Sequence, residues 1–258
     1  MSIRIAFFDI DGTLIDMQKK QITPTTLDTL RRLKANGIRI CLATGRSPMV
    51  VPHFEGVEFD ATLSYNGSYC YTCHGETIFS NPIPPEDLHK LLRNAAAIGR
   101  PVCLATDKRL AANGTDQDLT DYFLVPKIAV PIAADFDAVA ETPVYQIMMG
   151  GREDEYDAIL NGVHGAKIAA WWDRAVDIIP ASGGKGIGIQ KMLEYYGLDK
   201  SEAIAFGDGN NDIEMLQAVG TGVAMENASA QLKAVAADHC GHVAEEGIYH
   251  YCVEHGLI

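Results

Sequence analysis

A short apolar run at the start of the chain ends abruptly in two carboxylates. Residues 3–8 are aliphatic or aromatic apart from Arg4, and this pattern predicts a short buried strand. Asp9 and Asp11 follow directly, and Gly12 allows the backbone to turn after them. Carboxylates at the carboxyl end of a strand lie where open α/β sheets bind ligands. Asp and Gly are also ordinary turn residues, so the motif alone leaves both interpretations open.

The following segments alternate between helix and strand. The Thr23-Pro24 pair predicts a helix N-cap with proline at the first helical position, and Asn36-Gly37 predicts the end of that helix. A second apolar run, residues 38–43, ends at Thr44 and Gly45. This strand–helix–strand order is typical of a parallel sheet. The Thr44 hydroxyl and the Gly45 N–H could bind an anion there, or could simply form the exit from the strand.

Three prolines within residues 81–85 interrupt this order and indicate a domain boundary. The insert that follows predicts helices over 86–98, 118–124 and 153–163, and strands over 102–105, 109–112, 144–149, 167–171 and 175–179. Hairpins in this order favour an antiparallel sheet. After Gly183-Gly184 the earlier alternation resumes. We therefore predict a discontinuous parallel-sheet domain, residues 1–82 and 182–258, interrupted by an α+β domain, residues 83–181.

Composition and charge exclude several classes of function. The chain has 258 residues, of which 47% are hydrophobic and 21% are charged, as expected for a protein with a real core. Its formal net charge of −13 argues against nucleic-acid binding, which needs clustered Lys and Arg. No apolar run is long enough to span a membrane, and the early carboxylates argue against a signal peptide. The six scattered cysteines indicate free thiols in a reducing compartment, so we expect a cytoplasmic protein.

Polar residues follow four of the predicted strands. They are Asp9 and Asp11 after residues 3–8, Thr44 and Gly45 after 38–43, Asn66 after 60–65, and Asp208, Asn211 and Asp212 after 203–206. Because the carboxyl ends of parallel strands meet at one edge of a sheet, we expect these residues to lie together. Lys185 begins a predicted helix behind a glycine pair and adds a cation. Clustered carboxylates repel one another unless a cation lies among them. Phosphoryl transfer requires a metal, a carboxylate nucleophile and donors to the phosphate, and residues of these kinds are predicted at this edge.

Four runs of residues, in this order, resemble the four motifs of the haloacid dehalogenase superfamily. They are Asp9-Ile10-Asp11-Gly12-Thr13, Ala43-Thr44-Gly45-Arg46, Lys185-Gly186 and Gly207-Asp208-Gly209-Asn210-Asn211-Asp212. An insertion between the second and third motifs resembles the Cof-like branch with a type IIB cap. The resemblance implies an α/β fold, with a Rossmann-like parallel-sheet core and an inserted α+β cap domain. It also implies a Mg²⁺-dependent phosphatase acting on a small phosphorylated metabolite, such as a sugar phosphate.

The resemblance further implies a role for each residue of the motifs. Asp9 would be the nucleophile that forms an aspartyl-phosphate, and Asp11 would be the general acid and base. Mg²⁺ would be held by Asp9, the Asp11 backbone carbonyl and Asp208. The residues that would hold the transferring phosphoryl group are Ile10 through its amide, Thr44, Gly45 through its amide, Lys185 and Asn211. Asp212 would orient Lys185 or metal-bound water.

Several other assignments stay open at this stage. Asn66 would be either a further substrate contact or a turn residue, and Arg46 either a leaving-group contact or a surface residue. In the insert, Trp171, Trp172 and Arg174 could form a surface that stacks a sugar and binds an anion, or could belong to the core.

Two other functions fit the same motifs. A phosphomutase would share the scaffold but retain a bisphosphate intermediate. A non-catalytic phosphate-binding module would tolerate loss of Asp9 or Asp11, and both are present. We expect a small phosphorylated metabolite as the partner, no nucleic acid and no membrane, and a monomer or a small homo-oligomer.

Overall fold

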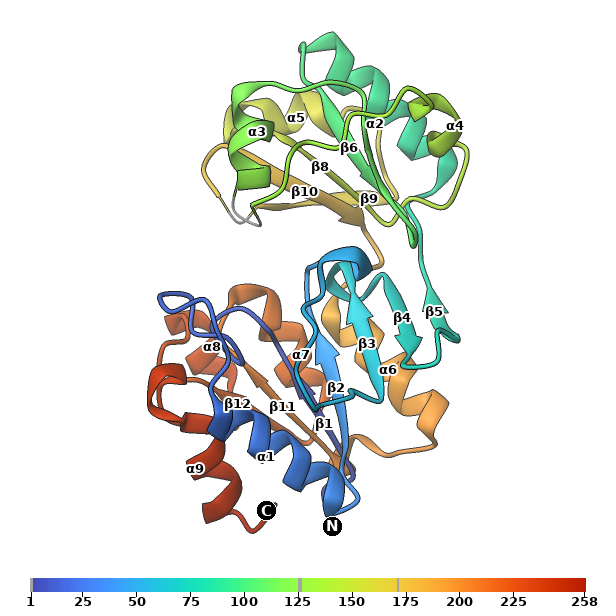
Figure 1. Cartoon of the computed structure of the whole chain (residues 1–258). Helices are drawn as coiled ribbons and strands as arrows, with labels where there is room; N and C mark the ends of the chain where they lie inside the picture. Colours follow the sequence, from blue (N-terminus) through green and yellow to red (C-terminus); the bar gives the residue numbers. More distant parts are fainter. Residues whose placement is uncertain (1, 125–126, 171) are drawn as a thin grey trace. The chain divides into compact units, whose positions relative to one another are not determined.

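The computed structural model describes residues 2–124, 127–170 and 172–258, and it divides into two compact units (Figure 1). The first unit comprises Met1–Gly45, Pro52–Ser80 and Gly184–Ile258. The second comprises Arg46–Val51 and Asn81–Gly183. The first unit is therefore built from three separate stretches of the sequence.

The described residues of the first unit form an eight-stranded sheet in the order β13-β12-β11-β1-β2-β3-β4-β5. Its strands are β1 (Ile5–Phe8), β2 (Arg39–Ala43), β3 (Ala61–Ser64), β4 (Tyr69–Thr72), β5 (Thr77–Ser80), β11 (Ala203–Gly207), β12 (Thr221–Ala224) and β13 (Asp238–His239). The strands from β13 to β3 are parallel, and β4 and β5 are antiparallel to their neighbours. β1 is central, with β11 on one side and β2 on the other.

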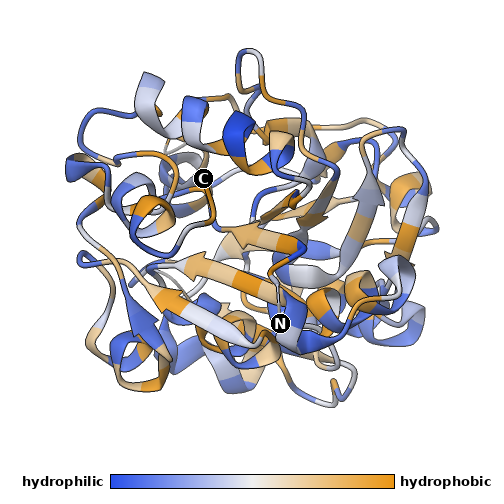
Figure 2. Cartoon of the chain, turned by 90° about the horizontal axis from the view of Figure 1, so that it is seen from below, coloured by the Kyte–Doolittle hydropathy of each residue, from blue (hydrophilic) through white to orange (hydrophobic). Residues whose placement is uncertain are grey.

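Helices cover both faces of this sheet. They are α1 (Pro24–Ala35), α6 (Lys185–Tyr196), α7 (Ile213–Ala218), α8 (Ala230–Val235) and α9 (Gly247–Glu254). On one face Phe206 stacks on Phe8 and meets Tyr251 of α9. Leu63 points to the opposite face, where Gly188 of α6 packs closely against it. With both faces covered, the central strands are buried along their length, and the strands at the centre of Figure 2 are mainly orange.

Two helices show why this sequence folds as predicted. The Thr23 side chain accepts a hydrogen bond from the Thr26 N–H, with Pro24 at the first helical position. Ile189, Met192 and Leu193 of α6 are buried, and Gly197 ends that helix in a left-handed conformation. The predicted N-cap of α1 and the predicted start of a helix at Lys185 are therefore confirmed.

The described residues of the second unit form an antiparallel sheet in the order β7-β6-β8-β10-β9, which confirms the predicted pairing. Its strands are β6 (Val102–Ala105), β7 (Leu110–Ala112), β8 (Gln146–Gly150), β9 (Ala166–Ala170) and β10 (Ala175–Pro180). Its helices are α2 (Pro85–Ala97), α3 (Gln117–Leu124), α4 (Phe136–Ala140) and α5 (Tyr156–Ile159). Leu88 and Leu91 of α2 pack with Ile147 and Met149 of β8 in one apolar core.

Some predicted elements differ from the structure. The helix predicted over 153–163 is wrong in extent, because Glu153–Glu155 is a 3₁₀ turn and α5 is only Tyr156–Ile159. The Glu155 carboxylate accepts the Arg152 N–H there, and Gly162 has a left-handed backbone. The strand predicted over 60–65 ends at Ser64, because Tyr65 has a φ of 51°. Trp171, the predicted end of another strand, lies outside the described residues.

The parallel sheet and the separate antiparallel sheet confirm the predicted α/β class. Across the described ranges, none of the helices has the length and apolar character that crossing a membrane requires.

Candidate active site

The carboxyl ends of four parallel neighbours, β11, β1, β2 and β3, meet at one edge of the first sheet, as expected. Backbone hydrogen bonds continue beyond the strands there. The Asp9 N–H donates to the Phe206 carbonyl at 3.0 Å, and the Asn66 N–H donates to the Thr44 carbonyl at 3.0 Å. The first residues after these strands are therefore fixed by backbone hydrogen bonds to the neighbouring strand or loop.

Lys185, at the start of α6, is the cation of this edge. Its Nζ donates to Asp9 Oδ1 at 2.6 Å and to Asp212 Oδ1 at 2.5 Å, and the residue is only 1% exposed. Burial by itself would lower the pKa of Lys185, but Asp212 and Asp9 together raise it above its ordinary value. The side chain therefore stays charged between its two carboxylates.

The Asp212 carboxylate contacts both Lys185 and the backbone of the Asp208 loop. Its Oδ1 accepts from Lys185, and its Oδ2 accepts the backbone N–H groups of Asp208 and Gly209, both at 3.0 Å. The residue is completely buried. A Cβ on Gly207 would lie 2.7 Å from the Cβ of Asp212, so only glycine fits there without displacement. Asp212 contacts Lys185 directly, and its orienting role toward that lysine stays a prediction.

Asp9 and Asp208 carry charges that burial disfavours. Burial raises the pKa of Asp9 well above its ordinary value despite Lys185, and Asp212 and Asp208 add to the effect. Burial also raises the pKa of Asp208 to about 6, although a hydrogen bond from the Thr13 hydroxyl at 2.8 Å opposes the shift. A nearby cation would stabilise both ionised carboxylates.

The donor set at this edge fits a divalent metal. One carboxylate oxygen from each of Asp9, Asp208 and Asp212 lies within 4.8 Å of the others. No other such cluster of three His, Cys, Asp or Glu side chains occurs in the part of the chain that the structure describes. These three aspartates contribute three carboxylates, whereas Lys185 contributes one ammonium group, so part of the negative charge is not neutralised by the lysine. All-oxygen ligands suit Mg²⁺ better than metals that prefer nitrogen or sulfur.

Gly12 allows the first loop to approach Asp208. Its φ is +93°, which disfavours other residues, and a Cβ there would lie 2.1 Å from Asp208 Oδ2. The loop is otherwise tight, since the Gly12 N–H donates to the Ile15 carbonyl at 2.9 Å. A glycine at this position therefore lets two predicted metal ligands come from loops on adjacent strands.

The predicted phosphate-binding residues of the first unit lie together. Thr44 is 1% exposed, and the Asn66 amide lies about 3.0 Å from the place where a Cβ on Gly45 would be. Asn211 Nδ2 donates to Asn66 Oδ1 at 3.2 Å. Asn66 also occupies a left-handed turn, with φ 50° and ψ 37°, so it is a turn residue as well as a side chain of this edge. Ile10, beside Asp9, is fully buried.

Arg46 and the aromatic residues of the insert belong to the second unit. Arg46 belongs to the second unit, where its guanidinium donates to the Val50 carbonyl at 3.1 Å. Also in the second unit, the Arg174 guanidinium lies over the Trp172 ring at 4.8 Å and pairs with Asp173 at 3.1 Å. Trp171 is outside the described residues. A substrate contact by Arg46 stays a prediction.

Two residues of the site had no role assigned from the sequence. Thr13 hydrogen-bonds Asp208, and Asn227, in the loop after β12, donates to the Gly12 carbonyl at 2.8 Å. Asn227 belongs to none of the motifs. The only available signal was topological, because β12 is parallel to β11 and its carboxyl end must reach the same edge.

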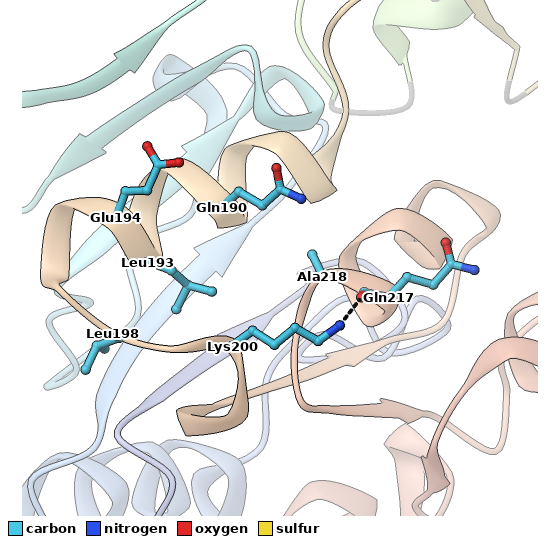
Figure 3. Close-up of a pocket in the computed structure, with 7 residues that line it drawn as sticks. All are labelled: Gln190, Leu193, Glu194, Leu198, Lys200, Gln217 and Ala218. Carbon is cyan, nitrogen blue, oxygen red and sulfur yellow. Dashed lines mark hydrogen bonds between the residues drawn. The ribbon is translucent and has the colours of Figure 1, made fainter.

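A cavity of about 270 Å³ lies between α6 and α7 (Figure 3). It is lined by Gln190, Leu193, Glu194, Leu198, Lys200, Gln217 and Ala218. Lys200 precedes β11, whereas Asp208 follows it, so the cavity lies near the amino end of that strand. None of the predicted site residues lines it.

Comparisons with known proteins agree with this geometry. A family model of haloacid dehalogenase-like hydrolases matches residues 6–252. The YkrA protein of Bacillus subtilis strain 168 is 31% identical over 100% of both chains. In the same organism, the 5-amino-6-(5-phospho-D-ribitylamino)uracil phosphatase YitU is 28% identical over 96% of this chain and 95% of its own.

Among solved structures, a sugar phosphatase of haloacid dehalogenase subclass IIB superposes with a TM-score of 0.87 at 26% identity. The match covers 99% of this chain and 100% of that one. These findings confirm the predicted family, and the chain belongs to the haloacid dehalogenase-like hydrolases.

Proposed function

We propose that this chain is a Mg²⁺-dependent phosphatase that hydrolyses a small phosphomonoester, such as a sugar phosphate, through an aspartyl-phosphate on Asp9. The observation that carries the proposal is the buried Asp9 carboxylate, held by Lys185 at 2.6 Å beside Asp208. The named activities of similar proteins support the substrate class, since a ribityl phosphate and sugar phosphates are both phosphomonoesters.

In the first step, Asp9 attacks the phosphorus atom and the bond from phosphorus to the leaving alcohol oxygen breaks. Lys185 favours the ionised form of Asp9 through its direct hydrogen bond. Asp11, which is only partly buried, gives its proton to the leaving oxygen, so the metabolite departs as a neutral alcohol. The products of this step are the alcohol and the aspartyl-phosphate.

In the second step, Asp11 takes a proton from a water molecule whose oxygen attacks the same phosphorus atom. The bond from phosphorus to the Asp9 oxygen breaks, which releases inorganic phosphate and restores the Asp9 carboxylate. Asp11 is then protonated and ready for the next substrate.

Mg²⁺ would be held by Asp9, the Asp11 backbone carbonyl and Asp208, where it supplies positive charge to the phosphoryl oxygens. Asp212 holds Lys185 and the backbone of the Asp208 loop in place. The groups that would bind the transferring phosphoryl group are the Ile10 and Gly45 amides, Thr44, Lys185, Asn211 and Asn66. Arg46 would bind the leaving group.

The domain roles belong to the same proposal. Residues 1–82 and 182–258 would be the catalytic core, and residues 83–181 a type IIB cap that selects the leaving group. We also propose a cytoplasmic location, supported by six free cysteines in the structure.

The test of the proposed function is a panel of sugar phosphates, nucleotides and cofactor phosphates, with inorganic phosphate as the readout. Phosphate release from some members, without isomerised products, is expected from a phosphatase. Bisphosphate-dependent isomerisation would identify a phosphomutase instead. Binding of the panel without any phosphate release would identify a binding module.

Removing the metal should stop turnover. We expect EDTA to abolish phosphate release and Mg²⁺ to restore it, because the carboxylate cluster holds more negative charge than Lys185 neutralises. Asp208→Ala should raise the Mg²⁺ concentration needed for half-maximal activity by roughly 100-fold. Asp199→Ala, an exposed aspartate that precedes β11, is the control and should leave that concentration unchanged. Full activity in the chelator would contradict the metal requirement.

A further inference from the structure

The loop between β12 and α8, residues 225–229, contacts the backbone of the Asp208 loop at several points. The Met225 N–H donates to the Gly207 carbonyl at 3.0 Å, and the Ser229 N–H donates to the Asp208 carbonyl at 2.9 Å. The Ser229 hydroxyl donates to Asn210 Oδ1 at 2.5 Å. This loop therefore follows the Asp208 loop along its length.

Asn227 extends these contacts to the loop that carries the nucleophile. Its Nδ2 donates to the Gly12 carbonyl at 2.8 Å, and its Oδ1 accepts the Val243 N–H at 3.1 Å. Both ends of one half-buried amide are thus used, one on the first loop of the chain and one near its end. A side chain that spans three loops in this way restricts all of them.

Gly12 is the position at which the first loop needs such a restraint. It has a φ of +93° and no side chain of its own to hold it. Along the chain, the peptide bond between Gly12 and Thr13 comes after the Asp11 carbonyl and before the Thr13 side chain. Thr13 donates to Asp208, a proposed metal ligand, at 2.8 Å. Rotation at Gly12 would move the Thr13 hydroxyl away from Asp208, and it would also turn the Asp11 carbonyl, which is another proposed metal ligand.

We propose that Asn227 is a positioning residue for the Mg²⁺ site, acting through its hydrogen bond to the Gly12 carbonyl. The inference rests on the proposed function, because it takes Asp208 and the Asp11 carbonyl as metal ligands. Asn227 itself stays outside the ligand set, since both of its amide atoms are used within the protein. Its contribution is preorganisation, in the way that partners of metal ligands elsewhere tune metal affinity.

Three variants separate this role from a general effect on the fold. Asn227→Ala removes both hydrogen bonds without adding charge. Asn227→Asp keeps an acceptor for the Val243 N–H but has no donor for the Gly12 carbonyl. Asn36→Ala is the matched control, because Asn36 Nδ2 donates to the Leu257 carbonyl at 2.9 Å, a bond of the same kind that includes no site residue.

The measurement is the dissociation constant of Mg²⁺ by titration calorimetry on the metal-free chain, with thermal unfolding recorded in parallel. We expect Asn227→Ala and Asn227→Asp to weaken Mg²⁺ binding by about tenfold or more, and Asn36→Ala to leave it unchanged. Turnover of both Asn227 variants should recover at high Mg²⁺. The added negative charge of Asn227→Asp would by itself favour cation binding, so the titration is repeated at high ionic strength, where that charge is screened.

The possible failures are distinct. If the wild-type chain binds no Mg²⁺, the proposed metal site is wrong and this inference is wrong with it. If the wild type binds Mg²⁺ and releases phosphate but Asn227→Ala binds Mg²⁺ equally well, only the inference is overturned. If Asn227→Asp binds Mg²⁺ like the wild type at high ionic strength while Asn227→Ala does not, the bond to Val243 carries the effect and the assignment to Gly12 is wrong.

Discussion

Replacing Asp9 with asparagine is expected to abolish phosphate release while leaving the fold intact. The amide has the same shape as the carboxylate, but it cannot attack phosphorus, so turnover should fall on the order of 10⁴-fold or more. Stability should change little, because burial already disfavours the charge on Asp9 and Lys185 keeps its second partner, Asp212. Steady-state phosphate release and thermal unfolding measure the two effects separately.

The control for this variant is Asp16→Asn, in the same loop. Asp16 is buried and its Oδ1 accepts the Gln18 N–H at 2.8 Å, a bond that asparagine can keep. Its Oδ2 pairs with Lys19 at 3.8 Å, and Lys19 is not one of the proposed site residues, so activity should be retained. Turnover by Asp9→Asn at a rate comparable with that of Asp16→Asn would rule out Asp9 as the nucleophile.

Replacing Lys185 with methionine should reduce both activity and stability. Methionine fills a similar volume but leaves Asp9 and Asp212 buried without their cation, which typically costs about 3–5 kcal/mol of unfolding free energy. Turnover should fall by about 10²- to 10³-fold if Lys185 donates to the transferring phosphoryl group, as proposed. Every substrate of the panel should be affected to a similar extent, since the loss acts on the phosphoryl group that all of them share.

The coupling between Lys185 and Asp9 can be tested directly. In Lys185→Met, the charges of Asp9 and Asp212 both lack their cation. Adding Asp9→Asn removes one of these charges, so the double variant should be more stable than Lys185→Met alone. Lys191→Met is the control on the same helix, because Lys191 pairs with Glu194 at the exposed surface, where such pairs contribute little. Strictly additive effects of the two site substitutions on unfolding free energy would contradict the ion pair as an energetic unit.

Elements with strong local signals could be predicted from the sequence. The cap at Thr23 and the stop at Gly37 define α1, and the buried spacing of Ile189, Met192 and Leu193 defines α6. The parallel order followed from strands that each end in polar residues. These features depend on a few residues that are close together in the sequence, so capping and hydrophobic spacing are sufficient to predict them.

Other features had no local signal. α4 has five residues and β13 has two, which is too short for a hydrophobic period to appear. Tyr65 leaves the strand with a φ of 51°, although an aromatic residue ordinarily favours strand, because the turn packs tightly and Gly67 lies against the Gly184 carbonyl. The proposed role of Asn227 depends on its hydrogen bonds to Gly12 and Val243, both distant in sequence, so it could be inferred only from the three-dimensional structure.

The placement of β1 between β2 and β11 has a consequence for the nascent chain. Ile5 pairs with Arg39 on one side and with Ala203 on the other. One edge of β1 therefore stays unpaired until the residues around Ala203 have been synthesised. Such distant pairing raises the contact order and slows folding, and an unpaired apolar strand edge invites association with other chains. During translation the residues from Asn81 to Gly183 can emerge and fold as a nearly continuous stretch, while the sheet of the first unit still lacks β11 and β12. Lys185 and Asp208 belong to that last part, so a chain truncated before them contains Asp9, the proposed nucleophile, without the lysine that pairs with it.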